Sequence, residues 1–234
     1  MLGLWRESRL MKIAILTGAG VSAESGLGTF RDKDGLWTKY DLEEVATPQG
    51  FQRNPKLVHD FYNARRKNAA EASTNAAHDA LAALERSEVH EVTLITQNID
   101  DLHERAGSTG VIHMHGQIMQ ALCAACDHRW PAPLAMQPTD PCPACAAPAT
   151  RPDVVWFGEV PYDMERIAEV VAASDLFVAI GTSAEVYPAA GLVELAAGDT
   201  LEINLAPSAR ANAFDRHIYG PASEVVPEWV ATLI

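Results

Sequence analysis

All four cysteines of the chain fall into two close pairs, Cys123 with Cys126 and Cys142 with Cys145. Two residues separate the members of each pair and fifteen separate the pairs, a spacing that is typical of zinc ribbons. Each pair supplies two thiolates, so together they complete a tetrahedral shell that leaves no position for water. The spacing therefore predicts a structural rather than a catalytic Zn²⁺ site. Four ordinary buried or free cysteines are the alternative interpretation.

A glycine-containing segment, Gly18-Ala19-Gly20-Val21-Ser22-Ala23-Glu24, follows a short apolar run. Such a turn lets backbone amides approach a pyrophosphate near the N-terminus of a helix. The acidic residue that a dehydrogenase carries about 20 positions later is missing, and the polar stretch GTFRDKDGLW stands there instead. We expect that stretch to be a lid over a bound cofactor. A tight strand–helix turn without a ligand is the alternative.

Small and polar residues also follow other apolar runs. Gln97, Asn98 and Asp100 come after VTLIT, Gly181-Thr182-Ser183 ends DLFVAIG, and Asn204 ends LEINL. In open parallel sheets, ligands bind outside the carboxyl ends of the strands. Several such strand ends in one chain favour a phosphate and ribose site over packing alone.

Two histidines, His113 and His115, lie in the run VIHMH. In a strand they would share one face, so one could be buried in the core and the other catalytic. With a reference pKa of about 6.5, an imidazole suits general base catalysis near neutral pH.

The elements that carry these residues alternate between apolar runs and helical patterns. Helical spacing covers AAHDALAALER and MERIAEVVAAS, and a further helix is predicted in KLVHDFYNARRKNAAEA. This alternation predicts an α/β fold with a mainly parallel, Rossmann-like sheet. The strands are expected at Lys12–Thr17, Val92–Thr96, Val111–His115, Asp175–Gly181 and Leu201–Leu205.

Two stretches interrupt the alternation. Residues 117–151 contain the cysteines and six of the 14 prolines, so we expect neither a helix nor a central strand there. We interpret them as a zinc-ribbon module and residues 32–73 as a cofactor lid and helical insert. Residues 1–31, 74–116 and 152–234 would then form the Rossmann-like, dinucleotide-binding domain.

Composition narrows the classes of partner. The 234 residues include 18 basic and 31 acidic side chains, a net charge of −13, which disfavours nucleic acid and favours a basic protein substrate. The N-terminus lacks a signal-peptide pattern, and no apolar run is long enough to span a membrane. With no such signal and with cysteines paired for metal binding, we expect a cytoplasmic location and no membrane partner. We also expect a monomer.

Taken together, GAGVSAESGLGTFRDKDGLW, TQNIDDLHERAG, HMHG, the cysteine pairs, FGE, GTS and INL occur in the order found in sirtuins, which the chain resembles over nearly its whole length. Sirtuins are NAD-dependent protein-lysine deacylases. FYNARRK resembles the Tyr-x-x-Arg pattern of the bacterial class III type, which prefers acidic acyl groups such as succinyl and malonyl over acetyl.

The resemblance implies roles residue by residue. It makes His115 the catalytic base, assisted by Asn98 and Asp100. Tyr62 and Arg65 would read an acyl carboxylate, and Phe157-Gly158-Glu159 with Val186-Tyr187-Pro188 would hold an extended substrate peptide. The implied NAD-binding residues are Gly18, Ala19, Gly20, Ser22, Glu24, Phe30, Arg31, Gln97, Asn98, Asp100, Gly181, Thr182, Ser183, Asn204 and Ala222.

The implied reaction consumes NAD. The acyl oxygen displaces nicotinamide from the ribose, His115 accepts a ribose hydroxyl proton, and water completes the release of lysine and O-acyl-ADP-ribose. Phe30 would shield the reacting carbon from water. An NAD-using ADP-ribosyltransferase and a non-enzymatic zinc-ribbon module are the competing interpretations. A dehydrogenase is disfavoured by the missing acidic ribose ligand.

Overall fold

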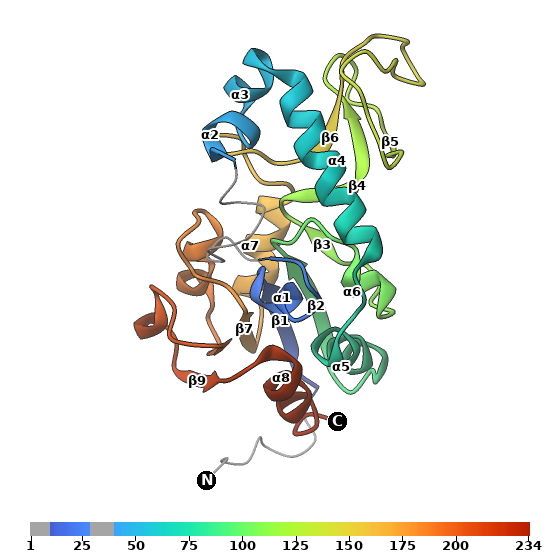
Figure 1. Cartoon of the computed structure of the whole chain (residues 1–234). Coiled ribbons are helices and arrows are strands. Elements are labelled where there is room, and N and C mark those ends of the chain that lie inside the picture. Colours follow the sequence, from blue (N-terminus) through green and yellow to red (C-terminus); the bar gives the residue numbers. More distant parts are fainter. Residues whose placement is uncertain (1–9, 29–39) are drawn as a thin grey trace.

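The computed structural model describes residues 10–28 and 40–234 (Figure 1). Its main sheet has six strands in the order β3-β2-β1-β7-β8-β9, and every neighbouring pair is parallel. This confirms the predicted α/β class. The strands are β1 (Lys12–Thr17), β2 (Glu91–Thr96), β3 (Ile112–His113), β7 (Leu176–Ile180), β8 (Asp199–Asn204) and β9 (Arg216–Tyr219).

Helices cover both faces of this sheet. Along β1, Ile13 and Ile15 pack on the side of α5 (Ala76–Arg86) and α8 (Ala222–Val230). Ala14 and Leu16 alternate to the other side, against α7 (Met164–Ala172) and the 3₁₀ helix η2 (Ala189–Leu195). Because both faces are buried, the strands read as continuous apolar runs. The remaining short helices here are α1 (Gly20–Ala23), α6 (Leu102–Arg105) and η3 (Ala211–Ala213).

A smaller unit lies beyond one end of the main sheet, at the top of Figure 1. It combines an antiparallel sheet, order β5-β4-β6, with three helices. One apolar cluster joins Phe61 and Tyr62 to Ile118, Val154 and Trp156, so the helices and this sheet share a core. The elements are α2 (Leu42–Val45), α3 (Pro48–Arg53), α4 (Pro55–Glu71), β4 (Gly116–Cys123), β5 (Arg129–Pro131) and β6 (Thr150–Val154).

The strand β4 corrects one expectation. We expected no central strand in residues 117–151, yet β4 lies in the middle of the three-stranded sheet. The expectation was wrong because it averaged proline over the whole stretch, and β4 itself contains none. Pro131 and Pro152 lie in β5 and β6, which are the edge strands, where a missing amide donor is tolerated.

Buried polar contacts attach α4 to this sheet. The Nε of Arg66 donates to the Ile118 carbonyl at 2.7 Å, and its guanidinium also contacts the Asn63 side-chain oxygen at 3.0 Å. Asn63 in turn exchanges two hydrogen bonds, both of 2.9 Å, with the backbone of Met136. These contacts fix the position of the helix that carries Tyr62 and Arg65.

The strand order defines where a ligand can bind. The chain passes from β1 outward to β2 and β3, and then returns to place β7 on the opposite side of β1. The carboxyl ends of β1 and β7 therefore flank a topological switch point, which is the usual ligand crevice of open α/β sheets. Within the described residues, no helix has the length and apolar character needed to cross a bilayer.

Candidate active site and metal centre

Glycines bring the two sides of the switch point into backbone contact. The Gly20 amide donates to the Gly181 carbonyl at 2.8 Å, and the Gly18 amide donates to Ile180 at 2.9 Å. A Cβ added at Gly20 would lie 2.7 Å from the Cα of Gly181, which itself has a φ of +64°. Ala19 is the N-cap of α1. The two glycine amides are thus used within the protein, and the lack of side chains lets the two backbones touch at the switch point.

Polar side chains link the other strand ends to this floor. The side-chain amide of Gln97, after β2, donates to the hydroxyl of Thr182 at 3.0 Å. The amide of Asn204, at the end of β8, donates to the Thr182 carbonyl at 2.7 Å. Ser183 accepts a backbone hydrogen bond from Ala209. The structure therefore brings together at one edge the strand-end residues that the sequence singled out.

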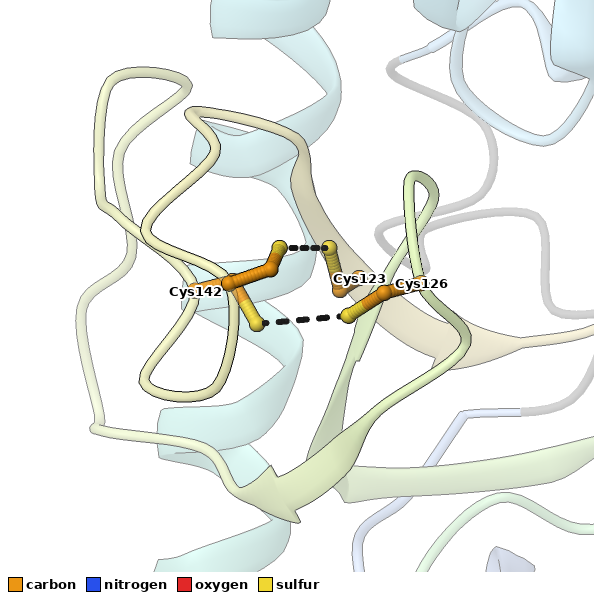
Figure 2. Close-up of side chains that lie close together, drawn as sticks. Cys123, Cys126 and Cys142 are labelled. Carbon is orange, nitrogen blue, oxygen red and sulfur yellow. Dashed lines mark hydrogen bonds between the residues drawn. The ribbon is translucent and has the colours of Figure 1, made fainter.

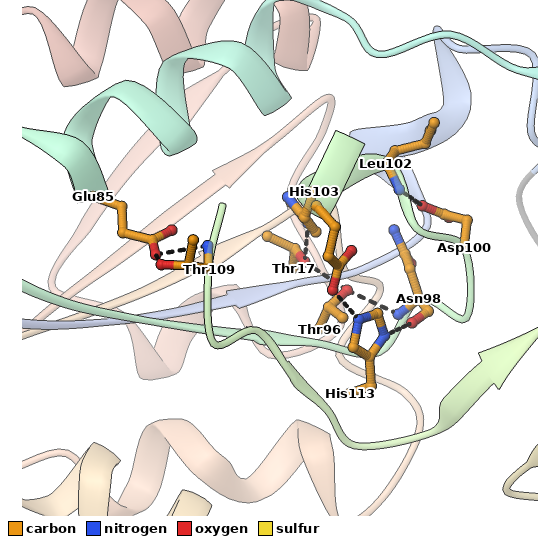
Figure 3. Close-up of polar contacts among 10 residues, drawn as sticks. Thr17, Glu85, Thr96, Asn98, Asp100, Leu102, His103, Thr109 and His113 are labelled. Carbon is orange, nitrogen blue, oxygen red and sulfur yellow. Dashed lines mark hydrogen bonds and ion pairs between the residues drawn. The ribbon is translucent and has the colours of Figure 1, made fainter. Parts of the chain in front are cut away.

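Ser22, Asn98 and Asp100 form a buried polar group beside the glycine turn. The Asn98 side-chain amide donates to Ser22 Oγ at 3.1 Å. The Asp100 carboxylate accepts the Leu102 amide at 3.2 Å, as Figure 3 shows. Burial raises the pKa of Asp100, while its hydrogen bonds with Leu102 and Ser22 oppose that shift. These groups are available to hydrogen-bond a ribose or a carboxamide.

A threonine–histidine chain beneath this group was not predicted. Thr17 Oγ1 donates to Thr96 Oγ1 at 2.8 Å and lies 2.9 Å from His103 Nε2, while Thr96 Oγ1 accepts the Asn98 amide at 3.0 Å (Figure 3). Burial lowers the pKa of His103 to about 3, so this imidazole is neutral. Thr17 and Thr96 end adjacent strands, and the chain holds the Gln97–Asn98 turn in place. In the sequence, the only indication of this hydrogen-bond chain was that a threonine ends each of the two strands.

The two candidate histidines have different surroundings. His115 Nδ1 lies 3.1 Å from the Gln97 carbonyl, so that nitrogen carries the proton and Nε2 keeps a free lone pair. Burial lowers the pKa of His115, with the bond to Gln97 opposing the shift. His113 instead places Nε2 2.6 Å from Glu104 and Nδ1 3.3 Å from the Asn98 carbonyl. Both nitrogens of His113 are therefore engaged within the protein, whereas only one nitrogen of His115 is.

The separation of these histidines does not arise from strand alternation. We expected a strand over Val111–His115, but β3 covers only Ile112–His113. His115 lies in the turn that follows, where the Met114 amide bonds the Thr96 carbonyl and Gly116 takes a φ of +79°. The tight connection to β4 ends the strand early and turns His115 toward Gln97.

Glu24 joins the glycine turn to the last helix. Its carboxylate accepts both the amide and the hydroxyl of Ser223, next to Ala222 in the first turn of α8. These bonds lower the pKa of Glu24. Glu24 thus fixes the start of α8 beside the crevice. The expected lid residues Phe30 and Arg31 lie outside the described residues.

Tyr62 and Arg65 lie on α4, one turn apart and in contact with each other. The Arg65 guanidinium carbon is 5.9 Å from the Tyr62 ring centroid. Burial lowers the pKa of Arg65, and the neighbouring Tyr62 and Asp100 oppose that shift. Further along α4, the Ala69 carbonyl accepts a hydrogen bond of 3.1 Å from Arg105 in α6, so α4 extends from the small unit to the segment that follows β2.

Each of the two loops that the sequence resemblance assigns to the peptide exposes an aromatic side chain. Phe157 is 44% exposed and Gly158 has a φ of +89°. The two carboxylate oxygens of Glu159 accept hydrogen bonds of 2.7 and 2.9 Å from the guanidinium group of Arg151. The Val186 carbonyl accepts the Ala190 amide at the start of η2. The adjacent Tyr187, 64% exposed, receives a hydrogen bond of 2.6 Å from Arg210.

The four cysteines converge as the spacing predicted. Their sulfur atoms all lie within 4.8 Å of one another, and Cys123–Cys145 and Cys126–Cys142 are separated by 3.7 and 3.8 Å (Figure 2). Bonds of about 2.3 Å to a tetrahedral zinc ion place thiolate sulfurs about 3.8 Å apart. The amides of Ala125 and Ala144 point at Cys123 and Cys142, each at 3.4 Å, and would support thiolates. The donor set therefore fits Zn²⁺.

Comparisons with known proteins agree with this geometry. An NAD-dependent protein deacylase of Caulobacter vibrioides is 60% identical over 232 residues, covering 96% of this chain and 98% of the relative. A crystal structure of a Sir2 homologue–NAD complex has a TM-score of 0.87 and 42% identity, covering 95% of this chain and 90% of that chain. A Sir2 protein with a deacetylated p53 peptide and 3′-O-acetyl ADP-ribose has a TM-score of 0.78 and 29% identity, covering 97% and 93%.

A family model described as the Sir2 family matches residues 18–188, from the glycine turn to Pro188. The matched segment contains the glycines, both histidines and all four cysteines. On this match and the identity to its relatives, the chain belongs to the Sir2 family.

Proposed function

We propose that this chain removes acyl groups from lysine side chains of proteins in an NAD-dependent reaction that releases nicotinamide and O-acyl-ADP-ribose. The observation that carries the proposal is the placement of His115. Its Nδ1 is bound to the Gln97 carbonyl, and Gln97 reaches across to Thr182 at the crevice floor. The lone pair on Nε2 is therefore available at the edge where a dinucleotide ribose would lie.

The residues at the strand ends suit a dinucleotide. Gly18, Gly20 and Gly181 let the chain segments after β1 and β7 touch through their backbones, since a Cβ at any of them would lie within 3 Å of the facing segment. We assign the pyrophosphate to this junction, with Ala19, Thr182 and Ser183 beside it. Ser22 and Glu24 are assigned to the phosphate and lid region, Asn204 and Ala222 to the adenosine side, and Gln97, Asn98 and Asp100 to the nicotinamide ribose. Phe30 and Arg31 remain assigned to the lid. When bound, NAD supplies an electrophilic ribose carbon from which nicotinamide can depart.

His115 acts as the general base in this proposal. Because its pKa is lowered by burial, the ring is neutral at pH 7 and can accept a ribose hydroxyl proton. Asn98 and Asp100 hold that ribose through their side chains. The chain of His103, Thr17 and Thr96 holds the backbone amide of Asn98 in place.

The substrate is an acylated protein segment bound in extended form. Phe157-Gly158-Glu159 and Val186-Tyr187-Pro188 would pair with its backbone, which makes recognition tolerant of sequence. Glu159 contributes by holding its loop through Arg151. We assign Tyr62 and Arg65 to the acyl carboxylate, because a guanidinium and a phenol both donate to carboxylate oxygens. Succinyl- and malonyl-lysine are then preferred to acetyl-lysine.

The remaining assignments follow the same division of the chain. Residues 1–31, 74–116 and 152–234 bind NAD, residues 32–73 form the lid and helical insert, and residues 117–151 hold one structural Zn²⁺. The closed four-thiolate shell leaves the metal without a catalytic position. Zinc-binding thiols fit a reducing, cytoplasmic location. We propose a monomer without nucleic-acid or membrane partners.

The test is a panel of peptides that differ only in the acyl group on one lysine, assayed with NAD by nicotinamide release. We expect a higher kcat/KM for succinyl and malonyl than for acetyl peptides. In Arg65→Met, loss of charge-assisted hydrogen bonds should lower succinyl turnover about 10²-fold and acetyl turnover far less. Equal losses on both peptides would refute the role of Arg65. Absence of NAD-dependent deacylation on every peptide would refute the function itself.

A further inference from the structure

The hydroxyl group of Tyr62 is already a hydrogen-bond acceptor within the protein. The indole Nε1 of Trp156, in the loop after β6, donates to Tyr62 Oη at 3.1 Å. Both side chains are buried, at 3% exposure each. A phenol carries one proton and two lone pairs, so an indole donor on one lone pair constrains where the O–H can point. The tyrosine is thus directed to donate elsewhere.

The phenol keeps its proton. Burial raises the pKa of Tyr62, and the nearby Arg65 and the bond from Trp156 only reduce that shift. A neutral phenol donates one hydrogen bond, and a carboxylate only accepts. Trp156 therefore leaves Tyr62 in the state required to bind an acid at the end of an acyl chain, next to the Arg65 guanidinium.

Trp156 is held in place by several neighbours. The backbone amide of Trp156 donates to Glu159 Oε2 at 2.8 Å, and the guanidinium carbon of Arg151 lies 3.5 Å from the centroid of the indole ring. Arg151 binds the same Glu159 carboxylate with two nitrogens and also donates to the Val154 carbonyl at 2.9 Å. The Phe51 ring, from α3, lies 5.1 Å away. These contacts leave Trp156 little freedom to change rotamer.

We propose that Trp156 is a positioning residue for acyl specificity: by donating its indole N–H to Tyr62, it orients the tyrosine O–H toward the carboxylate of an acidic acyl-lysine. This inference rests on the proposed function and deepens it. Trp156 touches the acyl group only through Tyr62. The Arg151–Glu159 pair connects this specificity to the Phe157-Gly158-Glu159 loop assigned to the peptide backbone.

Trp156→Phe tests the inference because it removes the N–H and keeps an aromatic ring. Loss of one hydrogen bond predicts about a tenfold fall in kcat/KM for a succinyl peptide, mainly through KM, and less than about a twofold change for acetyl. Calorimetry without NAD should show the same loss of succinyl-peptide affinity. Trp229→Phe is the matched control, since Trp229 is also 3% exposed and its indole nitrogen has no hydrogen-bond partner within the described part of the chain.

Tyr62→Phe supplies the decisive comparison. If Trp156 acts through the tyrosine hydroxyl, adding Trp156→Phe to Tyr62→Phe should not lower the succinyl-to-acetyl ratio further. An equal fall with both peptides, or the same fall in ratio when Tyr62 is already Phe, would overturn the inference. A wild-type protein that shows no succinyl preference would overturn the acyl assignment together with it. Inactivity of the wild type on all acyl peptides would instead overturn the proposed function.

Discussion

Replacing Gly20 with alanine tests the closeness of the two backbones at the switch point. The new Cβ would lie 2.7 Å from the Gly181 Cα and 2.8 Å from its carbonyl oxygen, and neither can move without shifting the main chain. Overpacking of this kind costs about 3 kcal/mol at the upper end of its usual range. Alanine recovers about 1 kcal/mol as a better helix former than glycine. The net loss is about 2 kcal/mol, or about 4–8 °C in Tm for a chain of this size.

Gly191→Ala is the matched control for this prediction. There the nearest atom to an added Cβ is a ring carbon of Tyr187 at 3.4 Å, and the glycine lies within η2. We expect its Tm to stay within about 2 °C of wild type, which corresponds to a change under about 0.5 kcal/mol. Thermal unfolding measures both variants, and titration calorimetry should show at least about a tenfold loss of NAD affinity in Gly20→Ala alone. A Gly20→Ala protein that matches Gly191→Ala in both measurements would refute the reasoning.

Two further predictions concern His115 and the cysteines. Because burial lowers the pKa of His115, its neutral form persists below pH 6.5; kcat/KM for deacylation should therefore be constant near pH 7 and fall tenfold per pH unit only below a midpoint under 6.5. A pH–rate profile measures this, and a midpoint above 6.5 would contradict it. Elemental analysis should find one zinc per chain, and a chelator or Cys126→Ser should lower Tm, since metal binding is coupled to folding. A metal-free protein with unchanged Tm would exclude the structural role.

The sheet was largely predictable because its strands are buried on both faces. Apolar runs such as Lys12–Thr17 end directly in the glycines and polar residues of the crevice, and the helix at Ala76–Arg86 has the bounds expected from its apolar spacing. The strand β9 was missed, since Arg216–Tyr219 is an edge strand whose exposed residues alternate with partly buried ones and give no apolar run. The cysteine cluster was predictable because two short spacings define the whole ligand set.

Contacts between distant segments could not be predicted. No local pattern places the Trp156 indole on Tyr62, and Gly20 against Gly181 depends on the strand order that brings β7 beside β1. His103 stood within the segment TQNIDDLH, yet its contact with Thr17 requires the pairing of β1 and β2. Such side chains acquire their roles from tertiary structure, and their types alone are common in loops and helix termini.

The most direct test of the central claim is mass spectrometry of the products formed from NAD and a succinyl-lysine peptide. The account predicts nicotinamide, free lysine peptide and O-succinyl-ADP-ribose in equal amounts, with all three lost in His115→Ala while NAD still binds. Transfer of ADP-ribose to protein, with the succinyl group left on the lysine, would contradict it. So would undiminished turnover in the alanine variant.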